Sequence, residues 1–203
     1  MPANDNLSLP RIGLAVLDRL ASIRPDGRVL MVSSARAGEG RSFVSMALAR
    51  QFEALGFGQV LLVETRLTPR PKGVPEGGFA GLLASGDLPD GAVRGSDRPK
   101  LSILPPGQGG ADAEQLLFQP GPVGRALQRL RQSWDLIVID APPLAACGAL
   151  VQQADATLLV VDAQRTSGRV VEEAIEAARL PREAVAGVLI NRQPGYLARW
   201  FGG

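Results

Sequence analysis

The chain has 203 residues, which is enough for one domain with a single sizeable core. Hydrophobic residues form 45% of the chain and charged residues 21%, and the net charge is only +2, so neither disorder nor a nucleic-acid partner is indicated. The absence of histidine excludes a Ser-His-Asp or Cys-His mechanism and any histidine metal ligand, and the single cysteine, Cys147, cannot form an internal disulfide.

The amino-terminal stretch "MPANDNLSLP" lacks the basic-then-apolar pattern of a signal peptide. No apolar run reaches the roughly 18 to 20 residues that a membrane-spanning helix needs. We therefore expect a cytoplasmic protein, and any connection to the inner membrane would be peripheral, through a partner or a surface contact.

The first expected element is an amphipathic helix at residues 12–23, packed on the chain's own sheet through Leu14, Leu17 and Leu20. Apolar runs rich in valine and isoleucine then alternate with segments of helical period, at residues 42–55, 123–131 and 169–179. The expected strands are "RVLMVSS", "QVLLVE", "LSILP", "DLIVIDAPP", "ATLLVVDA" and "AVAGVLINR".

Continuous apolar strands fit a sheet that is covered on both faces, and the repeated βα pattern favours parallel strands. The sequence therefore predicts an α/β fold with one doubly wound, mostly parallel sheet of about six or seven strands, flanked by helices. Two stretches rich in proline and glycine, at residues 65–78 and 105–112, are expected to be loops on the ligand face.

The stretch "SSARAGEGRSF" has nearly the layout of a phosphate-binding loop, because Gly38 and Gly40 lie between an expected strand and an expected helix. In the pattern G-x-x-x-x-G-K-[ST], Arg41 takes the lysine position and Ser42 takes the magnesium position. Arginine is a planar fork and does not replace a compact ammonium in a tight cradle. A strand, loop and helix with two glycines also occur in α/β proteins that bind no nucleotide.

The strand in "WDLIVIDAPP" ends in Asp140, and a carboxylate there can hold a magnesium-bound water beside the phosphates. The alternative is that Asp140 caps a turn before two prolines. The loop with Gly38 and Gly40 and the strand that ends in Asp140 together favour a nucleotide site more strongly than either does alone.

These motifs resemble those of the bacterial tyrosine kinases of capsule and exopolysaccharide synthesis, whose P-loop fold is related to MinD and ParA. "SSARAGEGRSFVSMALA" is similar to the family's Walker A segment, "VLLVETRL" to Walker A′ and "DLIVIDAPPL" to Walker B. Further segments resemble the family in the same order: "GGFAGLLASGDLPDGAV", "LSILPPGQGGADAEQLL", "LLVVDAQRTSGRVVEEAIEAARL" and "GVLINRQPG".

The differences from the family lie at positions that the resemblance links to metal binding, proton transfer and phosphorylation. The family's Walker A′ carries Asp-x-Asp-x-Arg, whereas Glu64, Arg66 and Thr68 hold those positions here. Arg66 puts a cation where the resemblance implies a metal-facing carboxylate, which disfavours magnesium if the side chain points inward. A family aspartate after Walker B corresponds to Gly148, and the tyrosine cluster of the family's tail is reduced to Tyr196.

The resemblance implies a nucleotide site formed by Gly38, Glu39, Gly40, Arg41, Ser42 and Phe43, with Asn191 on the adenine ring. An amide can donate to and accept from the adenine edge, although a strand-end turn residue is the alternative for Asn191. The implied catalytic residues are Arg41, Glu64 and Asp140, and the implied magnesium ligands are Ser42 and Asp140. ATP or ADP with magnesium is the implied cofactor, bound weakly or not at all.

Three functions remain open. The first is a degraded, kinase-like regulator or scaffold of polysaccharide synthesis or export that docks on the cytoplasmic face of a membrane-embedded polysaccharide co-polymerase, the chain-length determinant. The second is an active ATP-dependent tyrosine autokinase or ATPase of the same pathway. The third is a MinD- or ParA-like positioning ATPase, against which the "LSILPPG" and "VLINRQPG" segments argue.

We expect three segments: residues 1–27 with the amphipathic helix, a kinase-like domain at 28–192 and a tail at 193–203. The first helix lacks the family's spaced Glu and Arg motif for ring assembly, so a homo-oligomer stays an open expectation. Cys147 is expected to be a small buried hydrophobe near the site, since no histidine is present to activate it. Trp200 and Phe201 are expected to pack on the domain's own surface more readily than on a partner.

Overall fold

The computed structural model describes residues 9–24, 27–66, 77–108 and 111–192. Thr68, Tyr196, Trp200 and Phe201, together with most of the loop expected at 65–78 and the tail at 193–203, lie outside these residues. Expectations that depend on them stay predictions.

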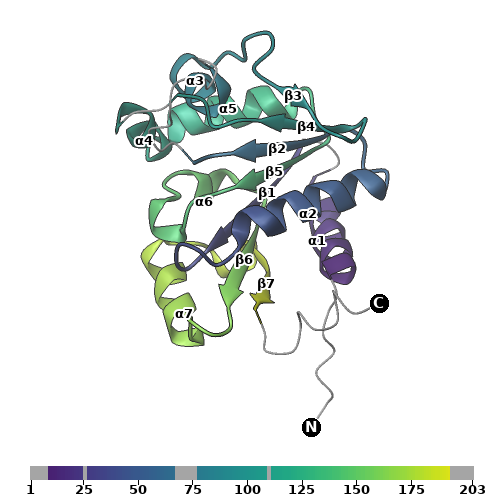
Figure 1. Cartoon of the computed structure of the whole chain (residues 1–203). Coiled ribbons are helices and arrows are strands. Elements are labelled where there is room, and N and C mark those ends of the chain that lie inside the picture. Colours follow the sequence, from purple (N-terminus) through teal and green to yellow (C-terminus); the bar gives the residue numbers. More distant parts are fainter. Residues whose placement is uncertain (1–8, 25–26, 67–76, 109–110, 193–203) are drawn as a thin grey trace.

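A single seven-stranded sheet forms the centre of the described fold, in the order β3-β4-β2-β5-β1-β6-β7 (Figure 1). Only β3 runs antiparallel, against β4, and all other neighbouring strands pair in parallel. The strands are β1 (Arg28–Ser34), β2 (Val60–Glu64), β3 (Arg94–Gly95), β4 (Leu101–Leu104), β5 (Leu136–Asp140), β6 (Ala156–Asp162) and β7 (Val185–Asn191). The predicted fold class is confirmed.

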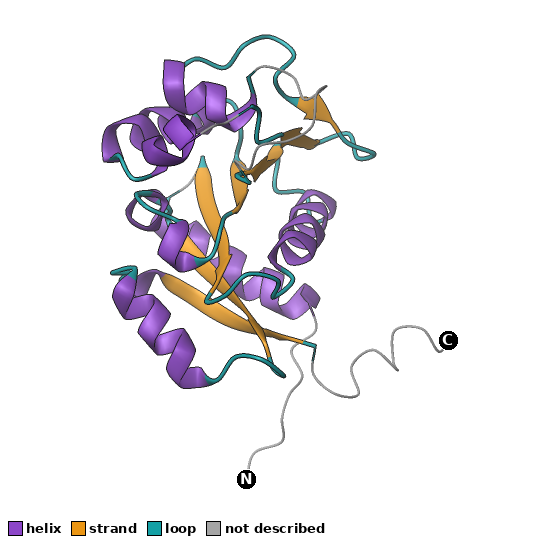
Figure 2. Cartoon of the chain, turned by 60° about the vertical axis from the view of Figure 1, so that its left-hand side comes forward, coloured by secondary structure: helices purple, strands orange, loops and turns teal. Residues whose placement is uncertain are grey.

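Helices cover both faces of the sheet (Figure 2). They are α1 (Leu9–Ile23), α2 (Arg41–Ala54), α3 (Gly78–Ser85), α4 (Ala111–Leu117), α5 (Pro120–Arg131), α6 (Leu150–Gln153) and α7 (Gly168–Ala177), with the short 3-10 turns η1 (Leu144–Ala146) and η2 (Arg182–Ala184). Helices α1 and α2 lie on one face, and α3 to α7 lie on the other.

Two buried clusters form because strand side chains alternate between the two faces. In β1, Val29 and Met31 pack under α3 to α7, whereas Leu30 and Val32 pack under α1 and α2. Both faces of the sheet are therefore buried, which explains why the strand sequences are continuous apolar runs.

The first helix packs on the sheet as expected, but not through all the predicted residues. Leu17 and Leu20 are buried, together with Val16, whereas Leu14 is 52% exposed. The expectation for Leu14 was wrong because the buried stripe of α1 runs through Val16, Leu17 and Leu20 and leaves Leu14 on the solvent side.

Parallel pairing brings the carboxyl ends of six strands to one edge of the sheet, and five of these strands end in a polar residue. The last residues of these five strands are Ser34, Glu64, Asp140, Asp162 and Asn191. The loop of the "SSARAGEGRSF" stretch follows β1 at this edge, where ligands bind in open α/β sheets.

Candidate functional site

The loop at residues 35–40 joins β1 to the start of α2 and depends on its glycines. Gly38 and Gly40 both have positive φ, 81° and 95°, a region that L-residues with a side chain avoid. A β carbon on Gly40 would collide with the side-chain nitrogen of Asn191. The helix that follows directs its first N–H groups and the positive end of its dipole toward the loop.

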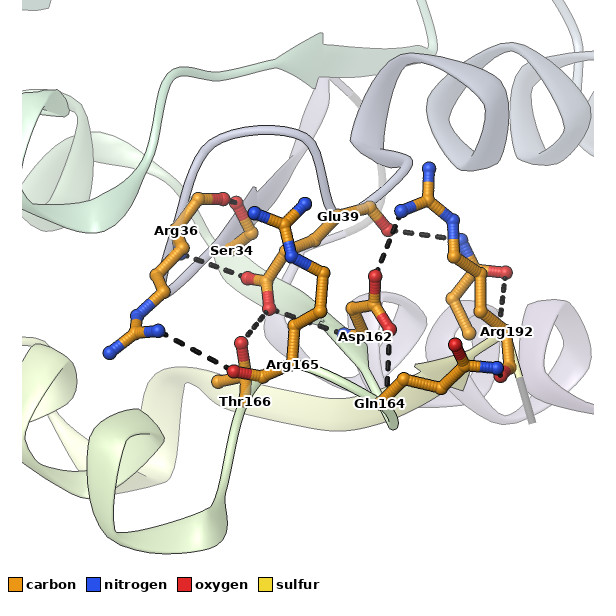
Figure 3. A network of polar contacts seen from close by, with 9 residues as sticks. Ser34, Arg36, Glu39, Asp162, Gln164, Arg165, Thr166 and Arg192 are labelled. Carbon is orange, nitrogen blue, oxygen red and sulfur yellow. Dashed lines mark hydrogen bonds and ion pairs between the residues drawn. The ribbon is translucent and has the colours of Figure 1, made fainter. Parts of the chain in front are cut away.

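Glu39 points into the protein, away from the loop's outer side. Its side chain is only 2% exposed, and its carboxylate accepts hydrogen bonds from the backbone N–H of Arg36 (2.9 Å), the backbone N–H of Asp162 (3.2 Å) and the hydroxyl of Thr166 (2.5 Å) (Figure 3). Only its backbone is therefore available to a phosphate, so its predicted place in the nucleotide site concerns the main chain.

Asn191 lies beside the loop and binds it directly. Its amide nitrogen donates to the carbonyl oxygen of Glu39 (2.9 Å), and its amide oxygen accepts from the backbone N–H of Arg192 (2.9 Å). The end of β7 is thus tied to the phosphate loop, and contact with an adenine ring stays a prediction.

An ion pair between the buried Asp162 and the exposed Arg192 lies next to this contact. The Asp162 carboxylate accepts from the backbone N–H of Gln164 (2.9 Å) and pairs with the guanidinium of Arg192 at 2.8 Å. The hydrogen bond from Gln164, and then that from Arg192, hold the pKa of Asp162 below its ordinary value. Sequence reasoning missed Asp162, although an aspartate that ends an apolar strand is the signal that identified Asp140.

Arg41 begins α2 and turns toward the end of β5. Its guanidinium donates to the carbonyl oxygen of Ala141, the residue after Asp140. Burial lowers the pKa of Arg41, the nearby Asp140 carboxylate opposes that shift, and the positive charge of Arg66 adds to it. Arg41 and Arg66 therefore lie close enough for their charges to interact.

Glu64 and Asp140 are direct neighbours in the sheet, because they are register partners at the ends of β2 and β5. Both side chains are half-buried, whereas Arg66 is exposed. Thr65, between the two Walker A′ positions, donates its hydroxyl to the carbonyl oxygen of Asp140 (2.7 Å). The sheet thus brings together the two predicted carboxylates and holds their backbones side by side.

Ser42 and Phe43 follow Arg41 on the exposed first turn of α2, and Phe43 is 71% exposed. The glycine conformations and the helix start fit a phosphate. A magnesium ion would meet Ser42, Asp140 and Glu64, but also the positive charges of Arg41 and Arg66. The residues therefore fit the phosphate group better than they fit its metal.

Gly148 explains one departure from the family pattern in structural terms. Its φ is 55°, and a β carbon there would collide with the carbonyl oxygen of Leu117. This chain's backbone therefore leaves no room at position 148 for the aspartate that the resemblance implies.

Cys147 is fully buried beside this segment. Its sulfur lies 3.2 Å from the carbonyl oxygen of Pro142 and 3.4 Å from the hydroxyl of Ser33. Burial raises the pKa of its thiol to about 11, so it remains protonated and unreactive near neutral pH. This environment agrees with the expectation that Cys147 is a small buried hydrophobe near the site.

No protein-family model matches the sequence. The succinoglycan biosynthesis transport protein ExoP of Rhizobium meliloti is 28% identical over 181 residues, which cover 82% of this chain and 22% of ExoP. The tyrosine-protein kinase CpsD of Streptococcus agalactiae is 28% identical over 176 residues, which cover 82% of this chain and 75% of CpsD. This chain thus spans about a fifth of the length of ExoP.

Solved structures of kinase domains have a fold similar to that of this chain. The BceF tyrosine kinase domain superposes with a TM-score of 0.75 at 21% identity, covering 90% of this chain and 75% of that domain. The VpsO kinase domain gives a TM-score of 0.71 at 26% identity, covering 91% of this chain and 96% of that chain. The McdA protein of Cyanothece, solved without ligand, shares the fold with a TM-score of 0.62 at 18% identity, covering 80% of this chain and 69% of that chain.

The length and hydropathy of a helix decide whether it can span a bilayer. No helix in the described part of the chain is both long enough and apolar enough to cross a membrane.

Proposed function

We propose that this chain, which belongs to the bacterial tyrosine kinases of capsule and exopolysaccharide synthesis and carries degenerate Walker motifs, is a regulator or scaffold with little or no kinase activity. It would bind phosphate or nucleotide at the loop of residues 35–40 and dock on a membrane-embedded polysaccharide co-polymerase.

One observation carries the proposal: Arg41 donates to the carbonyl oxygen of Ala141 at the edge where Glu64 and Asp140 end neighbouring strands, and the exposed Arg66 follows Glu64 by two residues. Phosphoryl transfer requires a metal ion and a base to meet the negative charge that develops on the phosphate oxygens. Two arginines near two carboxylates neutralise the anionic surroundings that the metal needs, while the backbone cradle for phosphate is kept.

The second candidate is an active ATP-dependent autokinase, and the pairing of Glu64 with Asp140 favours it. Glu64 would then act as the base, Arg41 would hold the phosphates, and Ser42 with Asp140 would hold magnesium. ATP with magnesium would supply the transferable phosphoryl group and its counter-charge.

A calorimetric titration with ATP, run with magnesium and with EDTA, separates the two candidates. We expect the affinities in the two conditions to agree within about threefold, and phosphate release to stay at background. Affinity that depends on magnesium, together with phosphate release that Asp140→Ala abolishes and the exposed control Asp97→Ala retains, would establish the enzyme instead.

The co-polymerase part of the proposal needs a separate test, because the resemblance implies that a partner's cytoplasmic tail completes the kinase site. We expect the purified chain to bind vesicles that contain the co-polymerase of its own organism, and not vesicles of the same lipids alone. The phosphate-release assay is repeated on the bound chain, where turnover at a kinase level would contradict the regulator and support the enzyme.

A further inference from the structure

We propose that Thr166 and Glu39 form a brace that positions the phosphate loop in its binding shape before any ligand arrives. Both are positioning residues, since their side chains act on the loop from its buried side. The functional meaning of the brace rests on the proposed phosphate site, whereas its existence does not.

The carboxylate of Glu39 is the centre of the brace. It is held by three donors from two parts of the chain: the N–H of Arg36 inside the loop, and the N–H of Asp162 and hydroxyl of Thr166 across the sheet edge. Three donors that converge on one buried carboxylate fix its position strongly, because each donor would lose its partner if the carboxylate moved.

Thr166 is itself fixed in place. Its backbone N–H donates to the carbonyl oxygen of Asp162 (3.0 Å), and that of Arg165 donates to the same oxygen (3.1 Å). This turn continues directly into α7 at Gly168. The short bond from the Thr166 hydroxyl therefore connects the phosphate loop to a rigid turn between β6 and α7 (Figure 3).

A second contact holds Glu39 through its main chain. The amide of Asn191 donates to the carbonyl oxygen of Glu39, so β6 and β7 both hold position 39. In addition, the hydroxyl of Ser34 donates to the carbonyl oxygen of Arg36 (2.6 Å) at the start of the loop. A loop held in this way loses less conformational freedom when an anion binds.

The brace matters for function because Gly38 and Gly40 alone do not define one loop shape. Glycines admit many conformations, and the contacts at Arg36 and Glu39 select one of them. The binding shape thus depends on Thr166, a residue that lies outside the Walker A, Walker A′ and Walker B segments.

Hydrogen exchange of the ligand-free protein tests the brace through Thr166→Val, which keeps the side-chain shape and removes the donor. We expect exchange of the Arg36 and Asp162 amides to rise about tenfold, the effect of losing a hydrogen bond to a charged group. Thr166→Ser restores the donor and is expected to stay within twofold of the wild type.

Asp155→Asn is the matched control, because Asp155 also accepts from a backbone N–H, that of Val29 (2.7 Å), and pairs with Arg131 at the opposite edge. We expect it to lower stability without changing exchange at Arg36. Exchange at Arg36 and Asp162 that is unchanged in Thr166→Val, or that rises equally in Asp155→Asn, would overturn the brace, as would failure of Thr166→Ser to restore protection.

Binding of inorganic triphosphate gives the functional readout. We expect Thr166→Val to weaken it five- to tenfold and Thr166→Ser and Asp155→Asn to leave it within twofold. Equal binding by Thr166→Val and the wild type would refute the functional role. If the wild type binds no triphosphate, the proposed phosphate site fails, whereas the exchange result still decides whether the brace exists.

Discussion

The guanidinium of Arg41 is engaged with the carbonyl oxygen of Ala141, close to Asp140 and within the electrostatic reach of Arg66. A lysine at position 41 would supply the same charge on a more compact group that can enter the cradle, but it would leave the positive charge of Arg66 two residues beyond Glu64. The departure from the family pattern at position 41 is therefore coupled to the one at position 66.

We expect Arg41→Lys alone to leave phosphate release from ATP near background. Arg41→Lys combined with Arg66→Asp is expected to release phosphate at least tenfold faster than either single variant, because the added carboxylate favours the metal. Arg41→Lys with Arg182→Asp is the matched control, since Arg182 lies in η2, which precedes β7 at the other edge of the sheet. Normal kinase turnover by Arg41→Lys alone would show that Arg66 does not oppose the metal.

The buried thiol of Cys147 makes stability depend on pH in alkaline solution. Its pKa is raised from 9.0 to about 11 in the folded protein, so its stabilising contribution is complete below pH 9 and is lost as the pH rises through 11. Between pH 8 and 11, the free energy of unfolding of the wild type should fall by roughly 2 kcal/mol more than that of Cys147→Ala. Urea titrations at each pH measure this, and parallel curves for the two proteins would contradict it.

At the scale of elements, α1 provides a comparison within one helix. Leu20 is fully buried, whereas Leu14 is 52% exposed. We expect Leu20→Ala to lower the free energy of unfolding by about 2 to 5 kcal/mol, and Leu14→Ala to change it by less than about 0.5 kcal/mol. Equal losses in urea titrations would mean that α1 packs with a different stripe.

The long elements could be predicted from the sequence because their patterns are strong. All of the predicted apolar runs became strands, and the expected helices at 42–55, 123–131 and 169–179 lie within a few residues of α2, α5 and α7. The short elements α3, α4, α6 and β3 were missed. With two to eight residues each, they are too short for a period to stand out, and α4 begins within the stretch at 105–112 that proline and glycine marked as a loop.

The candidate site could be predicted only where its functional residues lie together in one short segment of the sequence. Gly38, Gly40 and Ser42 follow a strand directly, and Asp140 ends one. The contacts of Glu39 with Thr166 and of Asn191 with the loop join residues more than 100 positions apart, so no local pattern reveals them. Likewise, only the backbone at Gly148 shows why an aspartate is excluded there.

At the scale of the whole molecule, the parallel sheet places two sets of groups at one edge. On one side of β1, β6 and β7 hold the phosphate loop through Glu39 and Asn191. On the other side, β5 and β2 present Asp140 and Glu64 beside the two arginines. The fold thus separates the loop that we propose binds phosphate from the carboxylates that would use a metal, so a change at one need not disturb the other.

A crystal soaked with a non-hydrolysable ATP analogue and magnesium measures both parts at once. Our expectation is density for the phosphates at the backbone N–H groups of residues 38–42, and no octahedral metal density between the hydroxyl of Ser42 and the carboxylate of Asp140. A well-ordered magnesium ion bridging Ser42, the phosphates and the water beside Asp140, with Arg66 turned away, would contradict it.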